Sequence, residues 1–289
     1  MKIELLGFPT TLGIPRPDRR HAPEVLRAAG LLDLLRQHAS AVADLGDMSL
    51  SAGQVADSWP DRVQKVVDSA RRQVALWQER HEADSLMLTV GGDHSTALGT
   101  LLTLAARGEE FDVIWIDAHG DFNTLATSPS GNPHGMVLSL ACGLLPHYLD
   151  AHLHPSQLHL WGIRDLDEGE RRLLEHHRVE VRTPDQVRQR TEAIIANLKP
   201  NVYLSFDIDS VDPSEAPGTG TPVPNGFRTA EALHLVTRIA QTKQVLALDL
   251  VEFHPDKDQN DMTRELSLAV IRTVIEEQVR RRQTEDAAH

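Results

Sequence analysis

The chain has 289 residues, 40% of them hydrophobic, which is long enough to bury a substantial core. Its formal net charge of −13 disfavours nucleic acid and anionic membrane surfaces as partners. No apolar run approaches the roughly 18 residues of a membrane span, and the N-terminal segment is too short and acidic for a signal peptide. We therefore expect a cytoplasmic protein without membrane or nucleic-acid partners.

The composition changes little along the chain, and no linker rich in Pro, Gly or Ser divides it. This predicts a single domain over residues 1–289. The one cysteine, Cys142, has no partner for an internal disulfide, and the apolar run around it indicates packing in a helix. A reducing compartment agrees with this cysteine usage.

Short apolar runs alternate with amphipathic segments. In chain order, the clearest signals are a strand at 1–8, a helix at 62–80, strands at 86–90 and 113–116, a helix at 228–241 and a strand at 245–250. Such alternation is typical of a mainly parallel sheet with helices on both faces, which makes a three-layer α/β domain. In open sheets of this kind, ligands bind at the carboxyl ends of the strands.

Three polar motifs begin where apolar runs end. Residues 91–95 read GGDHS, residues 117–121 read DAHGD, and residues 205–213 read SFDIDSVDP. Each motif by itself also fits a turn or a helix cap. Because His and Asp recur at strand ends in three separate places, the set favours a metal site.

The candidate ligands combine four carboxylates with two imidazoles. They are His94, Asp117, His119, Asp121, Asp207 and Asp209. In an extended chain, residues at i, i+2 and i+4 share one face, so the spacing within 117–121 predicts that three of these side chains lie together. Converging carboxylates repel one another unless cations neutralise them, and four negative charges balance two divalent ions.

The oxygen-rich ligand set favours hard cations, and it contains no thiolate. We therefore predict Mn²⁺ in preference to Zn²⁺, with Ni²⁺, Co²⁺ and Fe²⁺ left open. Two such ions roughly 3.5–4 Å apart would share and acidify one water, which yields a hydroxide nucleophile near neutral pH. The ligand set thus predicts metal-assisted hydrolysis.

The same motifs resemble those of the ureohydrolase superfamily, and within it most closely those of arginases. The segments that carry the likeness at the metal site are GGDHS at 91–95, DAHGDFNT at 117–124, SFDID at 205–209 and APGTGTP at 216–222. Residues 130–136, SGNPHGM, resemble the arginase substrate loop, and residues 162–170, GIRDLDEGE, resemble its second substrate segment. The likeness runs nearly end to end, since 22–31 is similar to the first helix of the family and 249–252 to its last catalytic strand.

The resemblance implies an arginase-like fold with an eight-stranded sheet, two Mn²⁺ per subunit and a homo-trimer or homo-hexamer. It implies hydrolysis of the guanidino group of L-arginine to L-ornithine and urea by a metal-bridging hydroxide. It also implies a grouping of ligands. One metal would be held by His94, Asp117, Asp121 and Asp209, and the other by Asp117, His119, Asp207 and Asp209.

Further roles follow from the resemblance. His134 would act as a proton shuttle, as suits a side chain that titrates near neutrality, and Glu252 would pair with the guanidinium. Together with Asp121 these are the expected catalytic residues. The expected substrate contacts are Asn123, Ser130 and Asn132 as neutral donors to the α-carboxylate, Asp167 and Glu170 as acceptors from the α-ammonium, and Thr221.

The chain departs from the usual arginase pattern at Val137, Asn225 and His254, which we expect beside the substrate pocket. These departures bear on specificity more than on the metal chemistry. N-hydroxyarginine, agmatine or another guanidino compound is therefore an alternative substrate. A non-catalytic, metal-binding regulatory protein is a more distant alternative, since none of the six proposed ligands is missing.

Overall fold

The computed structural model describes residues 1–14, 21–49, 58–82 and 84–287. In these residues one sheet of eight parallel strands has the order β2-β1-β3-β8-β7-β4-β5-β6. The strands are β1 Lys2–Phe8, β2 Ala41–Asp47, β3 Ser85–Gly91, β4 Asp112–Ile116, β5 Leu158–Trp161, β6 Glu180–Arg182, β7 Asn201–Asp207 and β8 Gln244–Val251. The predicted parallel sheet is confirmed.

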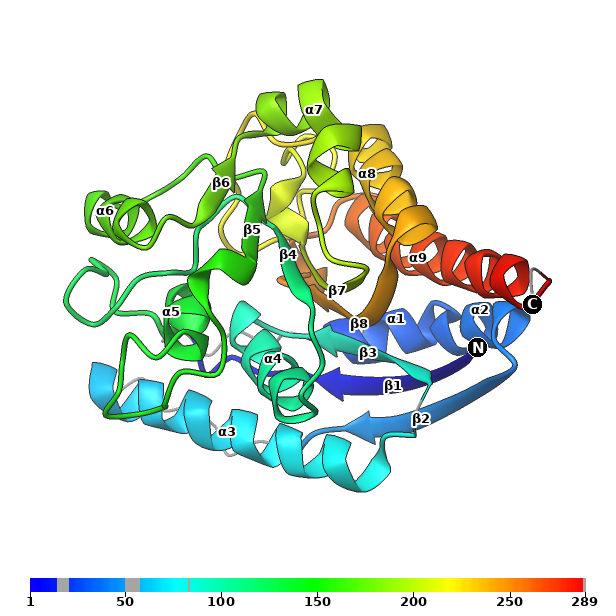
Figure 1. The fold of residues 1–289 in the computed structure, drawn as a ribbon, viewed down its shortest axis with the longest axis horizontal. Helices are drawn as coiled ribbons and strands as arrows, with labels where there is room; N and C mark the ends of the chain where they lie inside the picture. Colours follow the sequence, from blue (N-terminus) through cyan, green and yellow to red (C-terminus); the bar gives the residue numbers. More distant parts are fainter. Residues whose placement is uncertain (15–20, 50–57, 83, 288–289) are drawn as a thin grey trace.

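Helices cover both faces of this sheet, as Figure 1 shows. They are α1 Ala22–Ala28, α2 Leu31–His38, α3 Trp59–Arg80, α4 Ala97–Ala106, α5 Val137–Ala141, α6 Glu168–His176, α7 Pro184–Ala196, α8 Thr229–Thr242 and α9 Met262–Ala287. Helices α1, α2, α7, α8 and α9 enclose one core with Leu88 of β3, and α3, α4 and α5 enclose a second core with Met87. Successive strand residues point to opposite faces, so one strand supplies both cores.

The helix boundaries follow local signals that apolar periodicity does not contain. Helix α3 begins at Trp59 rather than at the predicted residue 62, because Ser58 accepts a hydrogen bond from Asp61 N at 3.4 Å and a proline lies in the first turn. The segment 22–31 belongs to two helices instead of one. Gly30, with a φ of +91°, separates α1 from α2 in a conformation that glycine adopts without strain.

The four central strands, β3, β8, β7 and β4, bring the polar motifs together. The GGDHS motif begins at the end of β3, Asp207 ends β7, Asp117 follows β4, and Glu252 follows β8. Because these strands are parallel, all four segments leave the sheet at the same edge. The register pairs Ile116 of β4 with Phe206 of β7, so Asp117 and Asp207 leave the sheet side by side.

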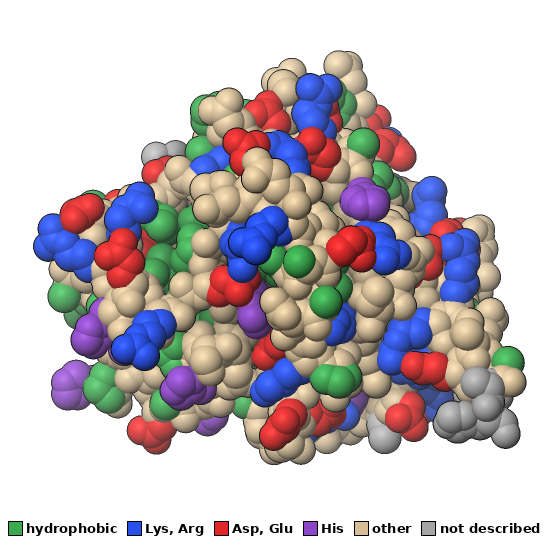
Figure 2. Space-filling model, turned by 45° about the horizontal axis from the view of Figure 1, so that its top comes forward, with side chains coloured by type: hydrophobic (Ala, Val, Ile, Leu, Met, Phe, Trp, Pro, Cys, Tyr) green, Lys and Arg blue, Asp and Glu red, His purple; other side chains and the backbone are tan. Residues whose placement is uncertain are grey.

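The surface in Figure 2 carries basic side chains interspersed with acidic ones. This face therefore has no single continuous acidic region, although the formal net charge of the chain is −13. Within the described residues, none of the helices combines the length and apolar character needed to cross a membrane.

Candidate metal centre

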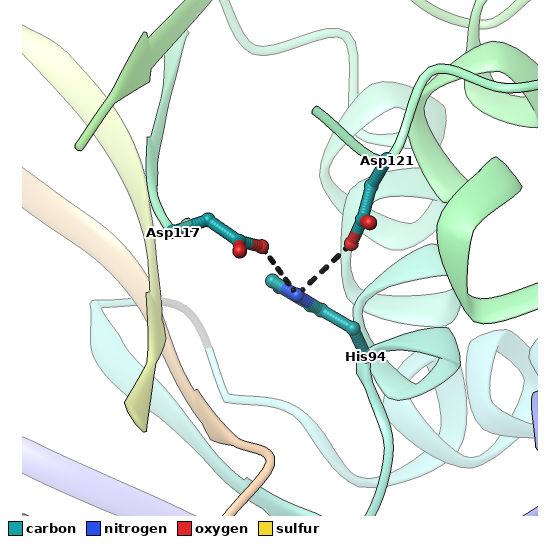
Figure 3. Close-up of side chains that lie close together, drawn as sticks. All are labelled: His94, Asp117 and Asp121. Atoms are coloured by element: carbon teal, nitrogen blue, oxygen red, sulfur yellow. Dashed lines mark ion pairs between the residues drawn. The ribbon is translucent and has the colours of Figure 1, made fainter. Parts of the chain in front are cut away.

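His94 lies against three carboxylates from two other strand ends. Its Nδ1 atom is 3.0 Å from Asp117 Oδ2, 3.1 Å from Asp121 Oδ2 and 3.0 Å from Asp207 Oδ2. All four side chains are buried. Figure 3 shows Asp117 and Asp121 directed at the His94 ring from different sides.

Two neighbours orient the His94 ring. Its Nε2 lies 2.7 Å from Ser205 Oγ, and an Nε2–H that donates to this hydroxyl leaves the Nδ1 lone pair directed at the carboxylates. The Trp115 indole stacks on the imidazole with 3.9 Å between ring centroids, and its Nε1 donates to Asp117 Oδ2 at 3.0 Å. Sequence reasoning assigned no role to Ser205 or Trp115. Strand alternation could have found both, since each precedes a predicted ligand by two residues.

His119 forms a second group with the same central aspartate. Its Nδ1 atom is 3.1 Å from Asp209 Oδ2 and 3.4 Å from Asp117 Oδ1. The six predicted ligands therefore lie in one cluster, in which Asp117 faces both histidines. In these contacts Asp209 lies beside His119, as in the expected grouping, whereas His94 has Asp207 beside it in the place where that grouping had Asp209.

The convergence does not come from strand alternation, contrary to the prediction from the i, i+2 and i+4 spacing. Strand β4 ends before the motif, and Asp117 Oδ1 accepts a hydrogen bond from His119 N at 2.7 Å, which bends the chain. Asp121 has a φ of +48°, in the left-handed region. Asp207 Oδ1 accepts from Asp209 N at 2.8 Å at the start of a 3₁₀ helix. Side-chain turns thus place the ligands.

The cluster carries more negative charge than its two histidines balance. Burial opposes protonation of His94, yet the carboxylates close to its Nδ1 atom raise the pKa of the imidazole well above its usual value. Burial, followed by the charges of Asp209 and Asp117, raises the pKa of Asp207 well above its usual value. His94 Nδ1 is buried without a hydrogen-bond partner. A divalent cation would satisfy this atom and neutralise the carboxylates, so the donor set fits a metal.

A cavity of about 210 Å³ adjoins the cluster. Its lining includes carboxylates of the cluster and every other residue that the sequence predicted for catalysis or substrate binding. These are Asn123, Ser130, Asn132, His134, Asp167, Glu170, Thr221 and Glu252. Sequence reasoning assigned no role to three further lining residues, Ser128, Gly135 and Asp165, although all three lie in or beside the segments that resemble arginases.

Glu252 and His134 contact each other at the cavity wall. Glu252 Oε1 lies 3.2 Å from His134 Nδ1 and accepts a hydrogen bond from His94 N at 3.0 Å. The Glu252 backbone has a φ of +63°, a conformation that costs roughly 1–3 kcal/mol outside glycine and clusters at functional sites. Burial opposes the charged form of His134, but the hydrogen bond to Glu252 raises the His134 pKa above its usual value. The imidazole is thus suited to hold a proton.

Some of the predicted substrate residues already form hydrogen bonds with other side chains of the protein. Asn123 Nδ2 donates to Asp167 Oδ2 at 3.0 Å, so this donor is already tied to a carboxylate. Thr221 Oγ1 donates to Asp209 Oδ2 at 2.9 Å, which places Thr221 at the ligand cluster. Glu170 is buried, and burial raises its pKa to about 8. Substrate recognition therefore rests on groups that also orient one another.

Comparison with known proteins agrees with this geometry. A profile of the Arginase family matches residues 1–276. The chain belongs to the arginase family. It is therefore a ureohydrolase that acts on guanidino or amidino C–N bonds, and members of this family use a binuclear metal centre.

Individual relatives show the same likeness. The arginase of Bacillus caldovelox is 31% identical, over 96% of this chain and 99% of that protein. Its solved structure matches with a TM-score of 0.87 and covers 95% of this chain and 98% of that chain. The proclavaminate amidino hydrolase of Streptomyces clavuligerus matches at 25% identity with a TM-score of 0.74, over 97% of this chain and 92% of that chain. These matches confirm the predicted arginase-like fold.

The three departures from the usual arginase pattern, which were expected beside the substrate pocket, do not themselves line the cavity. Val137 begins α5 and is buried in the core. Asn225 N donates to Asp212 Oδ2 at 2.7 Å, and buried His254 donates its backbone N–H to Gly218 O at 2.8 Å. Of the described residues, those that line the cavity include none of the three. Their positions therefore give little reason to expect an altered substrate.

A loop near the N-terminus, which sequence reasoning did not connect to the site, contacts His134. Gly13 N donates to Asp93 Oδ2 at 2.8 Å, and Gly13 O accepts from His134 N at 3.4 Å. A Cβ at Gly13 would lie 2.6 Å from His134 Cβ and 2.9 Å from His134 N, which is closer than real side chains approach. Glycine is therefore required here for close approach to the His134 backbone.

Gly13→Ala is expected to displace His134 and to lower kcat of this arginase-family enzyme by about 10–10²-fold, since small misplacements of a reacting group are costly. The bound metal should be unchanged, because the contacts of Gly13 are to His134 and Asp93, neither of which is a proposed ligand. Steady-state kinetics and metal analysis measure the two effects. A wild-type kcat would show that the loop does not place His134.

Proposed function

We propose that this arginase-family enzyme hydrolyses L-arginine to L-ornithine and urea. The observation that carries the proposal is the lining of one cavity. Glu252 and the cluster carboxylates form an acidic part of it, which suits a guanidinium. The polar groups of Ser130, Asn132 and Asp167 line the same cavity, and they suit an α-carboxylate and an α-ammonium.

The ligand set supports two Mn²⁺ ions. His94 and His119 each lie beside carboxylates, and Asp117 lies between them. We assign His94, Asp117, Asp121 and Asp207 to one ion, and Asp117, His119, Asp207 and Asp209 to the other. Four carboxylates and two imidazoles make an oxygen-rich set that favours Mn²⁺ over Zn²⁺. When bound, the ion pair supplies an acidified water as nucleophile.

Glu252, His134 and Asp121 then act on the substrate side. Glu252 pairs with the guanidinium by charge-assisted hydrogen bonds, and Asp121 accepts a hydrogen bond from the attacking water. The hydroxyl of that water would add to the guanidino carbon with release of one proton, and breaking the bond from this carbon to the δ-nitrogen would take one proton up. His134 delivers the proton that the departing δ-nitrogen takes up. The products are urea and ornithine.

The remaining cavity residues recognise the amino acid end. Ser130 and Asn132 donate to the α-carboxylate, and Asp167 accepts from the α-ammonium. Asn123 orients Asp167 through their 3.0 Å hydrogen bond. Glu170 assists as a second acceptor, and Thr221 orients Asp209.

The substrate assignment predicts strong discrimination against agmatine. Agmatine lacks the carboxylate, so the donors of Ser130 and Asn132 lose their partner, and such polar mismatches discriminate strongly. We expect kcat/KM for L-arginine to exceed that for agmatine by about 10³-fold or more. Urea release at fixed Mn²⁺ from L-arginine, N-hydroxyarginine, agmatine and guanidinobutyrate measures this.

Asp167→Ala serves as the matched variant in this experiment. It should weaken the binding of L-arginine and spare both metals, because Asp167 contacts Asn123 and not the ligand cluster. A preference of the wild type for agmatine or guanidinobutyrate would overturn the arginine assignment and leave the dimetal mechanism standing. A preference for N-hydroxyarginine would move the assignment to that substrate, which offers the same amino acid end.

The family resemblance also supports a proposal for organisation. We propose that residues 1–289 act as one domain in a cytoplasmic homo-trimer or homo-hexamer. Light scattering on the metal-loaded enzyme measures the mass of the assembly. A monomeric mass with full activity would contradict this part of the proposal.

A further inference from the structure

Trp59, the first residue of α3, differs from the other tryptophans of the chain. It is 42% exposed, whereas Trp77, Trp115 and Trp161 are fully buried. Its indole lies against Gly131, which stands between the cavity-lining residues Ser130 and Asn132. Its neighbours therefore bear on substrate recognition.

The Trp59 indole packs against the segment Ser128–Asn132, which we call the substrate loop. A Cβ at Gly131 of this loop would collide with Cδ2 and Cε2 of the indole. Gly131 also has a φ of +65°, which favours glycine. The indole thus lies directly on the loop backbone, with no side chain between them.

The start of α3 restrains Trp59. Ser58 Oγ lies 2.6 Å from an Asp61 carboxylate oxygen and accepts from Asp61 N at 3.4 Å, which caps the helix. Pro60 fixes its own φ and restricts the backbone of Trp59. The indole therefore projects toward the loop from a defined helix end.

The substrate loop is otherwise tied mainly to itself. Gly131 N donates to Ser128 Oγ at 3.0 Å, and Asn132 N donates to Ser130 Oγ at 3.3 Å. In the part of the chain that the structure describes, hydrogen bonds of the loop stay within residues 124–135. Asn132 Oδ1 is buried without a hydrogen-bond partner. Packing on Trp59 is thus a contact between the substrate loop and a separate element, helix α3.

We propose that Trp59 is a positioning residue that sets the preference of this enzyme for substrates with an α-amino acid end. It holds the substrate loop so that Ser130 and Asn132 face the α-carboxylate. The inference rests on the proposed function, in which these two residues bind that carboxylate. Without the indole the loop samples more positions, and the resulting mismatch falls on the carboxylate end of the substrate rather than on the guanidinium end.

Steady-state kinetics with two substrates test this role. Trp59→Ala should raise KM for L-arginine about tenfold, with kcat within about threefold of wild type. The kcat/KM for agmatine should change less than about twofold, because agmatine makes no carboxylate contact. The ratio of the two kcat/KM values therefore falls about tenfold. Trp59→Phe keeps an aromatic face on Gly131 and should restore most of the ratio.

Met262→Ala is the matched control. Met262 is the other large hydrophobic side chain that is exposed among the described residues, at 36%, and it begins α9. This variant should leave both substrates at wild-type values. A Trp59→Ala enzyme that loses activity toward both substrates in proportion keeps the wild-type ratio, and this outcome would overturn the positioning role.

Acrylamide quenching of fluorescence gives a readout without turnover. Trp59 is the exposed tryptophan, so quenching reports on it, and Trp59→Phe should remove the quenchable signal. Saturating L-ornithine on the metal-loaded enzyme should order the loop and lower the quenching constant. Putrescine, which lacks the amino acid end, should not. Equal protection by both ligands, or by neither, would contradict the proposal.

The outcomes separate the two proposals. A wild type that prefers agmatine overturns the proposed function, and with it the role of Trp59. A wild type that prefers L-arginine, with an unchanged ratio in Trp59→Ala, overturns only the role of Trp59.

Discussion

Replacing His94 by alanine is expected to remove one of two bound metal ions and to lower urea release by about 10³-fold or more, since the ions supply both nucleophile and charge. His94 Nδ1 lies within 3.0–3.1 Å of Asp117, Asp121 and Asp207. Without this nitrogen the site loses a ligand, and the same carboxylates hold the ion less tightly. Metal analysis after dialysis and a urea assay at fixed Mn²⁺ measure the two effects.

Asp209→Ala is the paired test, because Asp209 lies beside His119 rather than beside His94. It should deplete the other ion, whereas added Mn²⁺ should reactivate the wild-type apoprotein. His159→Ala is the control, since His159 is a partly buried histidine that pairs with Asp112 and Glu180. Two bound ions and full turnover in both His94→Ala and Asp209→Ala would reject the ligand assignment.

His134→Ala is expected to keep both metal ions and to lower kcat by about 10²–10⁴-fold, the usual scale of proton-transfer assistance. The metal ions should stay because the His134 Nδ1 atom contacts Glu252 Oε1, at 3.2 Å, and Glu252 is not a proposed ligand. The side chain therefore acts beside the ligand cluster rather than within it. Steady-state kinetics with metal analysis check both parts, and added imidazole should restore some of the lost rate.

The metal content of His134→Ala decides between two roles. Retained metal with slow turnover agrees with a proton shuttle. Loss of metal would make His134 a ligand or a structural residue. Loss of metal in Gly13→Ala as well would show that the contact between Gly13 and His134 is structural.

Apolar alternation predicted the parallel sheet, because a strand buried on both faces has a nearly continuous apolar sequence. The runs at 86–90 and 245–250 lie within β3 and β8, whose observed bounds extend them by one residue at each end. Helix starts were less accurate. Helix α3 starts after the cap Ser58, and α2 starts after the left-handed Gly30. Both starts depend on a single residue, which apolar periodicity does not detect.

The spacing of the proposed ligands in the sequence predicted that they lie together, but not the backbone conformation that brings them together. The spacing of Asp117, His119 and Asp121 correctly indicated a shared location, but for a reason that the structure overturns. The chain turns after β4 through a hydrogen bond from His119 N to Asp117 Oδ1. A side-chain turn and an extended strand both bring such residues together, so spacing does not tell them apart.

By itself, the sequence determined which chemistry is present, because carboxylates and imidazoles after apolar strands are costly unless a cation joins them. It also determined the parallel class of the sheet. Only the tertiary structure decided that β8 and β7 lie between β3 and β4, that Asp207 rather than Asp209 contacts His94, and that Gly13 and Trp59 contact the site. These facts depend on pairing and packing between segments far apart in the chain, which no local periodicity encodes.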